Sequence, residues 1–70
     1  MDSPLTKLAS IAIRNIAEEP NEMNRASILD AAAQIFAAEG DARRSEQIAT
    51  TAAVIREAAN AQLQLKSLFS

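Results

Sequence analysis

The chain has 70 residues, with seven lysines and arginines against nine aspartates and glutamates, so its formal net charge is −2 at pH 7. It contains no cysteine and no histidine, which excludes a disulfide framework, a zinc-finger type of site and a histidine-dependent catalytic triad. A chain of this length forms one small domain at most, and its slightly acidic balance offers no basic excess for nucleic acid.

Large apolar side chains are scarce in this sequence. Apolar residues make up 49% of the chain, but sixteen of them are alanine, which leaves eighteen larger ones. Burying one large aliphatic side chain contributes roughly 1.5–3 kcal/mol, whereas ordering each residue costs about 1.5 kcal/mol. Because this balance is marginal for a small monomer without disulfides, we predict that the chain associates with itself.

The sequence shows no targeting or membrane segment. Its first residues, Met1 to Pro4, are acidic rather than basic, unlike a signal peptide. The longest unbroken apolar runs are four residues, against the about 20 that a membrane-spanning helix needs. We therefore expect a cytoplasmic protein of a bacterial or phage type.

The few helix breakers divide the chain into three predicted helices, because alanine favours helix and only one glycine and two prolines interrupt it. Ser3 is a suitable N-cap and Pro4 a suitable first residue for a helix over about residues 4–18. One face of this helix is apolar, made of Leu5, Leu8, Ala9, Ala12, Ile13 and Ile16.

Pro20 ends the first helix or kinks it sharply, so the first two helices are either separate or one bent rod. Asn21 is a suitable cap for a second helix over about residues 22–39. The apolar face of this helix is broad enough to contact two neighbours. It is built on rows at heptad spacing, Ile28/Ile35 and Leu29/Phe36.

Gly40 occupies the place of a left-handed residue after a helix, and Asp41 can cap a third helix over about residues 42–69. So short a link makes the second and third helices antiparallel neighbours. The third helix would be about 42 Å long against about 27 Å for the second. Its last part, about residues 60–69, therefore needs another surface: the first helix folded back, a second copy of the chain or, as we prefer, a mixture of both.

Alanines at heptad spacing indicate close packing between the second and third helices, since small side chains let two backbones approach. The pairs are Ala31/Ala38 and Ala52/Ala59. The alternative is that alanine is simply a favourable helix former on a half-exposed face.

Two segments of the second helix, ILDAA at 28–32 and FAAEG at 36–40, resemble the first helix of the TetR family of DNA-binding repressors. In that family a short helix, a glycine-containing turn and a recognition helix follow. Residues 41–61 contain neither glycine nor proline and predict one continuous helix. The element that would read DNA is therefore missing, and the resemblance assigns no role to any residue here.

No catalytic constellation is present in the sequence. Glu18, Glu19 and Glu22 form its dense carboxylate cluster, which is either a weak divalent-cation site or, as we prefer, an acidic corner that suits the start of the second helix. The serines have no histidine to activate them. We predict no enzymatic activity, no cofactor, no metal site and no small-molecule substrate.

Arg43 and Arg44 are adjacent cations in the first turn of the third helix, where the helix dipole disfavours them. They are candidates for contact with an anion or an acidic partner. The preferred interpretation is ion pairing within a turn, with Glu39, Asp41 or Glu46.

The sequence thus predicts an all-α fold: a small three-helix bundle or a long kinked antiparallel hairpin that dimerises into a larger bundle. We interpret the protein as a helical interaction module that binds a copy of itself and another protein through apolar helix faces. The candidate partner-binding residues are Leu63, Leu65, Leu68 and Phe69. The alternative is a small nucleic-acid-binding regulator that contacts phosphates through Arg43, Arg44 and Arg25.

Overall fold

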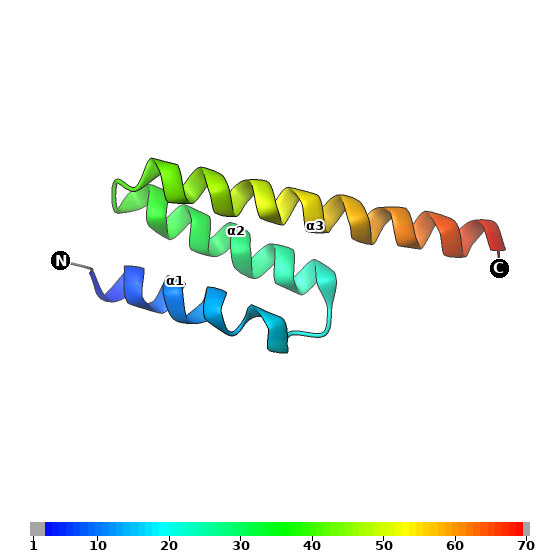
Figure 1. Cartoon of the computed structure of the whole chain (residues 1–70), viewed down its shortest axis with the longest axis horizontal. Helices are drawn as coiled ribbons and strands as arrows, with labels where there is room; N and C mark the ends of the chain where they lie inside the picture. The colour runs from blue at the N-terminus through cyan, green and yellow to red at the C-terminus, as the bar shows by residue number, and fades with distance from the viewer. Residues whose placement is uncertain (1–2, 70) are drawn as a thin grey trace.

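The computed structural model describes residues 3–69, which form three α-helices and one short 3₁₀ turn. The elements are α1 (Pro4–Arg14), η1 (Ile16–Glu18), α2 (Glu22–Ala38) and α3 (Ala42–Phe69). Neighbouring helices run antiparallel, with α2 between α1 and α3 (Figure 1). The predicted all-α helical bundle is confirmed, and the first two helices are separate rather than one bent rod.

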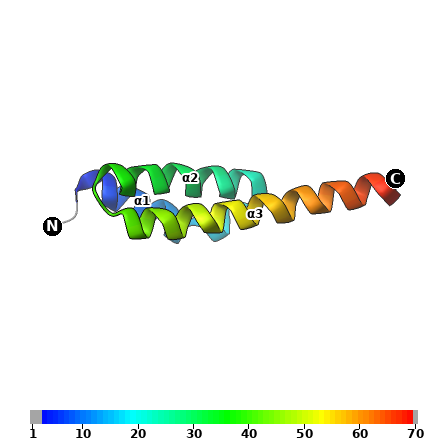
Figure 2. The same ribbon diagram turned by 90° about the horizontal axis from the view of Figure 1, so that it is seen from above.

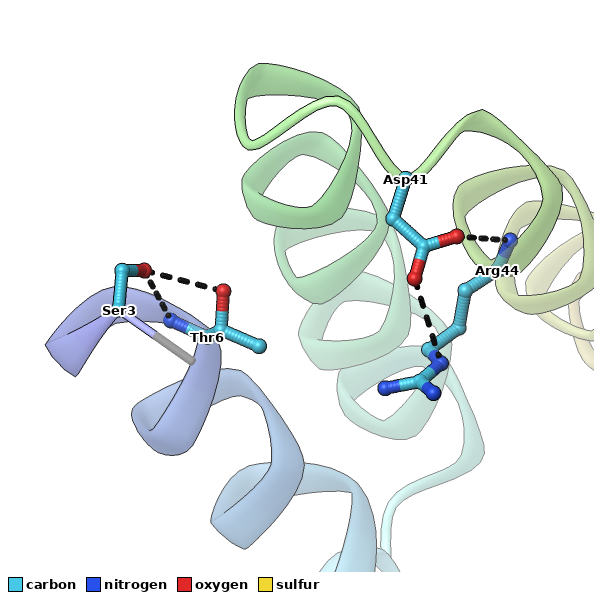
Figure 3. Close-up of polar contacts among 4 residues, drawn as sticks. All are labelled: Ser3, Thr6, Asp41 and Arg44. Carbon is cyan, nitrogen blue, oxygen red and sulfur yellow. Dashed lines mark hydrogen bonds and ion pairs between the residues drawn. The ribbon is translucent and has the colours of Figure 1, made fainter. Parts of the chain in front are cut away.

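Each helix begins at the polar residue that the sequence predicts as its cap. The side-chain oxygens of Ser3, Asn21 and Asp41 each accept a hydrogen bond from the backbone N–H three residues later, at 3.1, 3.0 and 3.1 Å. Figure 3 shows the first and third of these caps. A helix start leaves its first N–H groups without partners in the helix, and the caps satisfy one of them each.

The chain reverses between α2 and α3 through a glycine turn. Gly40 has φ of +87°, in the left-handed region. Its N–H donates to the Ala37 carbonyl at 3.1 Å, and the Asp41 N–H donates to the Phe36 carbonyl at 2.9 Å. These are the two bonds of a Schellman helix end, and they bring the start of α3 directly beside the end of α2.

The first helix is shorter than the predicted range of about 4–18. It ends at Arg14, and the backbone tightens into η1 before the corner at Pro20. The proline holds Glu19 in extended backbone, with ψ of 113°. The Arg25 side chain then donates to two carbonyls at this corner, those of Ala17 at 3.5 Å and of Glu19. These bonds fasten the end of η1 to α2.

The core is small and lies along both sides of α2. One cluster of buried residues joins α1 to α2 and consists of Ala9, Ala32 and Phe36. A second joins α2 to α3 and consists of Ala26, Leu29 and Ala52. Ile13 and Ile48 pack against both clusters, so the two parts of the core are connected.

The prediction that heptad-spaced alanines pack between α2 and α3 is correct for the pair on α3 and wrong for the pair on α2. Ala52 and Ala59 are buried, whereas Ala31 and Ala38 are exposed. The buried heptad pair of α2 is instead Ala26/Ala33. The reason is that α1 and α3 share the broad apolar face of α2, and their joint packing turns Ala31 and Ala38 towards solvent.

The three helices lie in a thin layer. The principal dimensions of the Cα trace are 51 × 22 × 11 Å, so the shortest dimension is half of the next. In both views α3 extends alone past the ends of α1 and α2 (Figures 1 and 2). The first helix packs along α2 and does not reach this end of α3. The prediction that the first helix covers residues 60–69 is therefore wrong.

Within residues 3–69, no helix combines the length and the apolar character that crossing a bilayer requires.

Candidate interaction surface

The last ten described residues of α3 are the least covered part of the fold. Every residue from 60 to 69, here called the α3 tail, is exposed. The four predicted partner-binding side chains are among them, with exposed fractions of 60% for Leu63, 54% for Leu65, 78% for Leu68 and 87% for Phe69. Their exposure agrees with a role in binding, which stays a prediction.

These four side chains do not form one cluster. At 100° per residue, Leu63 lies about 160° around the helix from Leu65, on nearly the opposite side. Leu63 instead lines a shallow pocket at the start of α2, beside Pro20 and Met23. Leu65, Leu68 and Phe69 share the other side of the tail, and a further shallow pocket between the two sides is lined by both Leu63 and Leu68.

Leu65 and Leu68 belong to a longer row on α3 that sequence reasoning missed. The row, here called the outer stripe, consists of Val54, Ala58, Ala61, Leu65 and Leu68, all of them exposed. Their spacing alternates between four and three residues, which is the heptad pattern of helices that pair along a seam. The outer stripe carries no charged residue. The alternating spacing of these residues can be read from the sequence. It can be recognised as a separate row only when the residues of α3 that face α2 are known.

A second apolar surface opens between the helices. A groove of about 380 Å³ is lined by side chains from α1, η1, α2 and α3. This three-helix groove includes Ile13, Ile16, Leu29, Ile48, Thr51 and Ile55. It exists because α1 and α3 both pack on α2 but not closely on each other, which leaves the partly buried isoleucines between them accessible from outside.

The groove and the outer stripe are continuous along α3. Gln47 and Thr51 line the groove, and they are also the two positions that precede Val54 in the alternating heptad spacing. Seven positions, from residue 47 to residue 68, therefore follow one seam of the helix. The first of these positions border the groove and the last lie on the tail.

Arg43 and Arg44 differ in their surroundings, although both are exposed. The Arg44 guanidinium forms an ion pair with Asp41, with 3.6 Å between Nε and Oδ2 (Figure 3), and its Cζ lies 5.1 Å from the centre of the Phe36 ring. Of the three predicted pairing partners, Asp41 is the one that the structure shows. Arg44 thus covers one edge of the core at the α2–α3 turn.

Arg25, the third arginine of the predicted phosphate-binding set, lies near the other end of α2. Thirteen helical residues separate it from Ala38, which corresponds to about 20 Å. Its guanidinium is already hydrogen-bonded to the carbonyls of Ala17 and Glu19. The structure therefore does not bring Arg25, Arg43 and Arg44 into a single anion-binding site.

The acidic corner is organised by local hydrogen bonds. Glu19 Oε1 accepts from the Asn21 N–H at 3.0 Å and from Asn24 Nδ2 at 3.5 Å. No group of three metal-ligating side chains comes together in the part of the chain that the structure describes. Within that part, every fully buried side-chain nitrogen or oxygen has a hydrogen-bond partner.

Comparison with known proteins identifies no relative: no family model, no curated protein and no solved structure matches the chain. The candidate site is therefore defined by the structure alone and consists of the outer stripe and the three-helix groove.

Proposed function

We propose that this protein is a small helical interaction module rather than an enzyme, and that it binds protein partners, including its own copies, through the apolar surface of α3. The observation that carries the proposal is the α3 tail. Its ten consecutive residues are exposed and hold four large apolar side chains, three of which, Leu65, Leu68 and Phe69, share one side of the helix. A contiguous apolar face of this kind on a small protein marks an interaction site.

The tail has no structural role within the monomer that explains its length. Its helix runs beyond α2, so its apolar side chains contribute nothing to the core described above. Ordering these residues costs free energy, and a helical tail in isolation is marginally stable in water. Burial of one face against a partner supplies the missing stabilisation.

The chemistry of the surface favours a helical, apolar partner. The outer stripe is uncharged, and the Arg56–Asp30 ion pair already joins α3 to α2 within the chain. Binding would therefore depend on apolar burial, with charged side chains at the rim affecting orientation more than affinity. An amphipathic helix laid along another helix is a recurrent solution for such a face.

Energetics favour a partner that contributes as much apolar surface as the tail does. Each buried leucine or phenylalanine contributes roughly 1.5–3 kcal/mol, and association costs about 4–15 kcal/mol in lost freedom. The three large side chains Leu65, Leu68 and Phe69 balance this cost only if the partner buries a comparable set.

The test is the molar mass of the purified chain in sedimentation equilibrium, compared with the double variant Leu65→Ala, Phe69→Ala. The variant is expected to have a lower mass than the natural chain at the same concentration and to keep its helical circular dichroism, since both side chains are exposed in the monomer. The matched control is Asn60→Ala, an exposed position on the same tail that lies about 140° around the helix from Leu65 and opposite Phe69. A natural chain that stays monomeric, or a variant of unchanged mass, contradicts the proposal.

A further inference from the structure

We infer that α3 pairs with α3 of a second copy in antiparallel orientation, so that the outer stripes face each other and Phe69 of each copy enters the three-helix groove of the other. This inference rests on the proposed function and names the partner and geometry of the same surface.

The outer stripe and the three-helix groove lie on one continuous row of heptad positions, so one partner helix can cover both. The heptad positions run without interruption from Gln47 and Thr51, which line the groove, to Leu65 and Leu68 on the tail. One helix laid along this seam covers the tail and reaches the mouth of the groove. Each chain has one such groove and one such tail, so two copies satisfy each other reciprocally, as a two-fold interface requires.

The order of side-chain sizes selects the register. If Ala58 lies opposite Ala61 of the second copy, Val54 lies opposite Leu65 and Thr51 opposite Leu68. Two alanine pairs then meet at the centre, where small side chains allow close approach of the backbones. On each side of these alanines, Val54 of one copy meets Leu65 of the other. The larger side chains therefore lie away from the point where the two helices are closest.

The same register places Phe69 at the groove. Phe69 lies about 40° around the helix from Leu65, on the side where Thr51 and Ile55 line the groove. The two copies are related by a two-fold axis, so the groove side of one α3 lies next to the groove side of the other. Phe69 of one copy is then level with Thr51 of the second copy. The ring, 87% exposed in the monomer, then meets an apolar space of about 380 Å³. A parallel pair would leave Phe69 about 27 Å from Thr51 of its partner.

The length of the pairing suits a specific dimer. A specific interface covers at least about 500 Å² on each partner, which is a tenth of the 5213 Å² surface of this chain. The strip from residue 51 to residue 68 is about 27 Å long, and the groove adds to it. Met23 at the start of α2 lies beside Ala59 and Leu63, so α2 begins level with the centre of the pair and the rest of α2 lies towards residue 42 in each copy.

Cysteine cross-linking tests the pairing directly, because the chain has no natural cysteine. Val54→Cys and Leu65→Cys are purified separately, mixed and oxidised. The inference predicts a mixed 54–65 disulfide as the main product, since opposed positions in such a pair lie within disulfide reach. Both side chains are exposed in the monomer, and circular dichroism checks that the variants fold. The matched control replaces Val54→Cys with Ala53→Cys, at the same level of α3 but about 100° around the helix.

The outcomes separate this inference from the proposed function. A mixed product several-fold above the Ala53→Cys control supports the antiparallel pair. Efficient disulfide formation by Leu65→Cys with itself indicates a parallel pair, which overturns the inference and leaves the interaction module standing. Association in sedimentation equilibrium without preferred cross-linking overturns the register alone. A monomer in both measurements overturns self-association together with the pairing.

Discussion

Ala26 on α2 and Ala52 on α3 are both completely buried, with 0% exposure, in the cluster that joins the two helices. Two methyl groups therefore occupy a place where most helix pairs hold larger side chains, and the helices approach closely. Because no space is left around these two side chains in the α2–α3 cluster, this contact is sensitive to side-chain volume.

Replacing Ala52→Leu is expected to lower the free energy of unfolding by about 1–3 kcal/mol, because a larger side chain at this point forces the helices apart. The measurement is urea unfolding at one fixed protein concentration, since association would otherwise change the apparent stability. Ala53→Leu is the control, because Ala53 is the next residue and is exposed. Equal effects of the two substitutions would show that α2 and α3 do not pack at Ala52.

Gly40→Ala is expected to cost about 1–2 kcal/mol of stability, which is the penalty of a side chain in left-handed backbone. A Cβ at Gly40 would meet no atom within 4 Å, so the loss comes from the backbone and not from a clash. Gly40→Asn should lose less, because asparagine tolerates this conformation better. Thermal unfolding of the three proteins checks the order, and an alanine variant as stable as the natural chain would contradict it.

Arg25→Gln is expected to loosen α1 and η1 selectively. The substitution removes the guanidinium that bonds to the carbonyls of Ala17 and Glu19, and the loss is about 1–2 kcal/mol. Amide hydrogen exchange should accelerate in residues 4–18 more than in α3. Arg14→Gln, an exposed site on α1, is the control. Uniform acceleration along the whole chain would argue against this fastening role.

The Asp30–Arg56 ion pair between α2 and α3 is expected to contribute little. Both side chains are more than a third exposed, and pairs of this kind contribute about 0.2–1 kcal/mol. A double-mutant cycle with Asp30→Asn and Arg56→Gln measures the coupling, which should fall as salt is added. The same cycle on Asp41 and Arg44, a pair within one helical turn, is the comparison. A large coupling that persists in high salt would contradict this estimate.

The features that sequence reasoning predicted correctly are local ones. The caps at Ser3, Asn21 and Asp41 and the left-handed Gly40 depend on hydrogen bonds that span three to five residues. Residue type and position therefore suffice to predict them. The helical character follows in the same way from alanine content and the scarcity of breakers.

The last residue of α1 could be located only from the tertiary structure, because Arg25 of α2 binds the segment that follows α1. Nothing in the segment from Arg14 to Pro20 shows that the Arg25 guanidinium will bind the carbonyls of Ala17 and Glu19. Without that contact, the sequence is equally compatible with a helix that continues to residue 18, which is what we predicted.

The candidate site shows the same division. The sequence indicated that the end of α3 is apolar and lacks a partner within α2, and it identified Leu65, Leu68 and Phe69. It also placed Leu63 with them, although Leu63 lies about 160° around the helix from Leu65. Only the packed structure shows which of two apolar rows on α3 faces α2 and which faces solvent.

The sequence by itself determined where the helices begin, where the chain turns and that α3 is longer than α2, since these depend on backbone preferences and side chains a few residues apart. The tertiary structure decided how each helix is rotated about its axis, and so which alanines are buried, where the groove opens and which stripe is left uncovered. The physical reason is that an alanine-rich helix has several apolar faces of similar free energy, and the choice among them depends on all its neighbours at once.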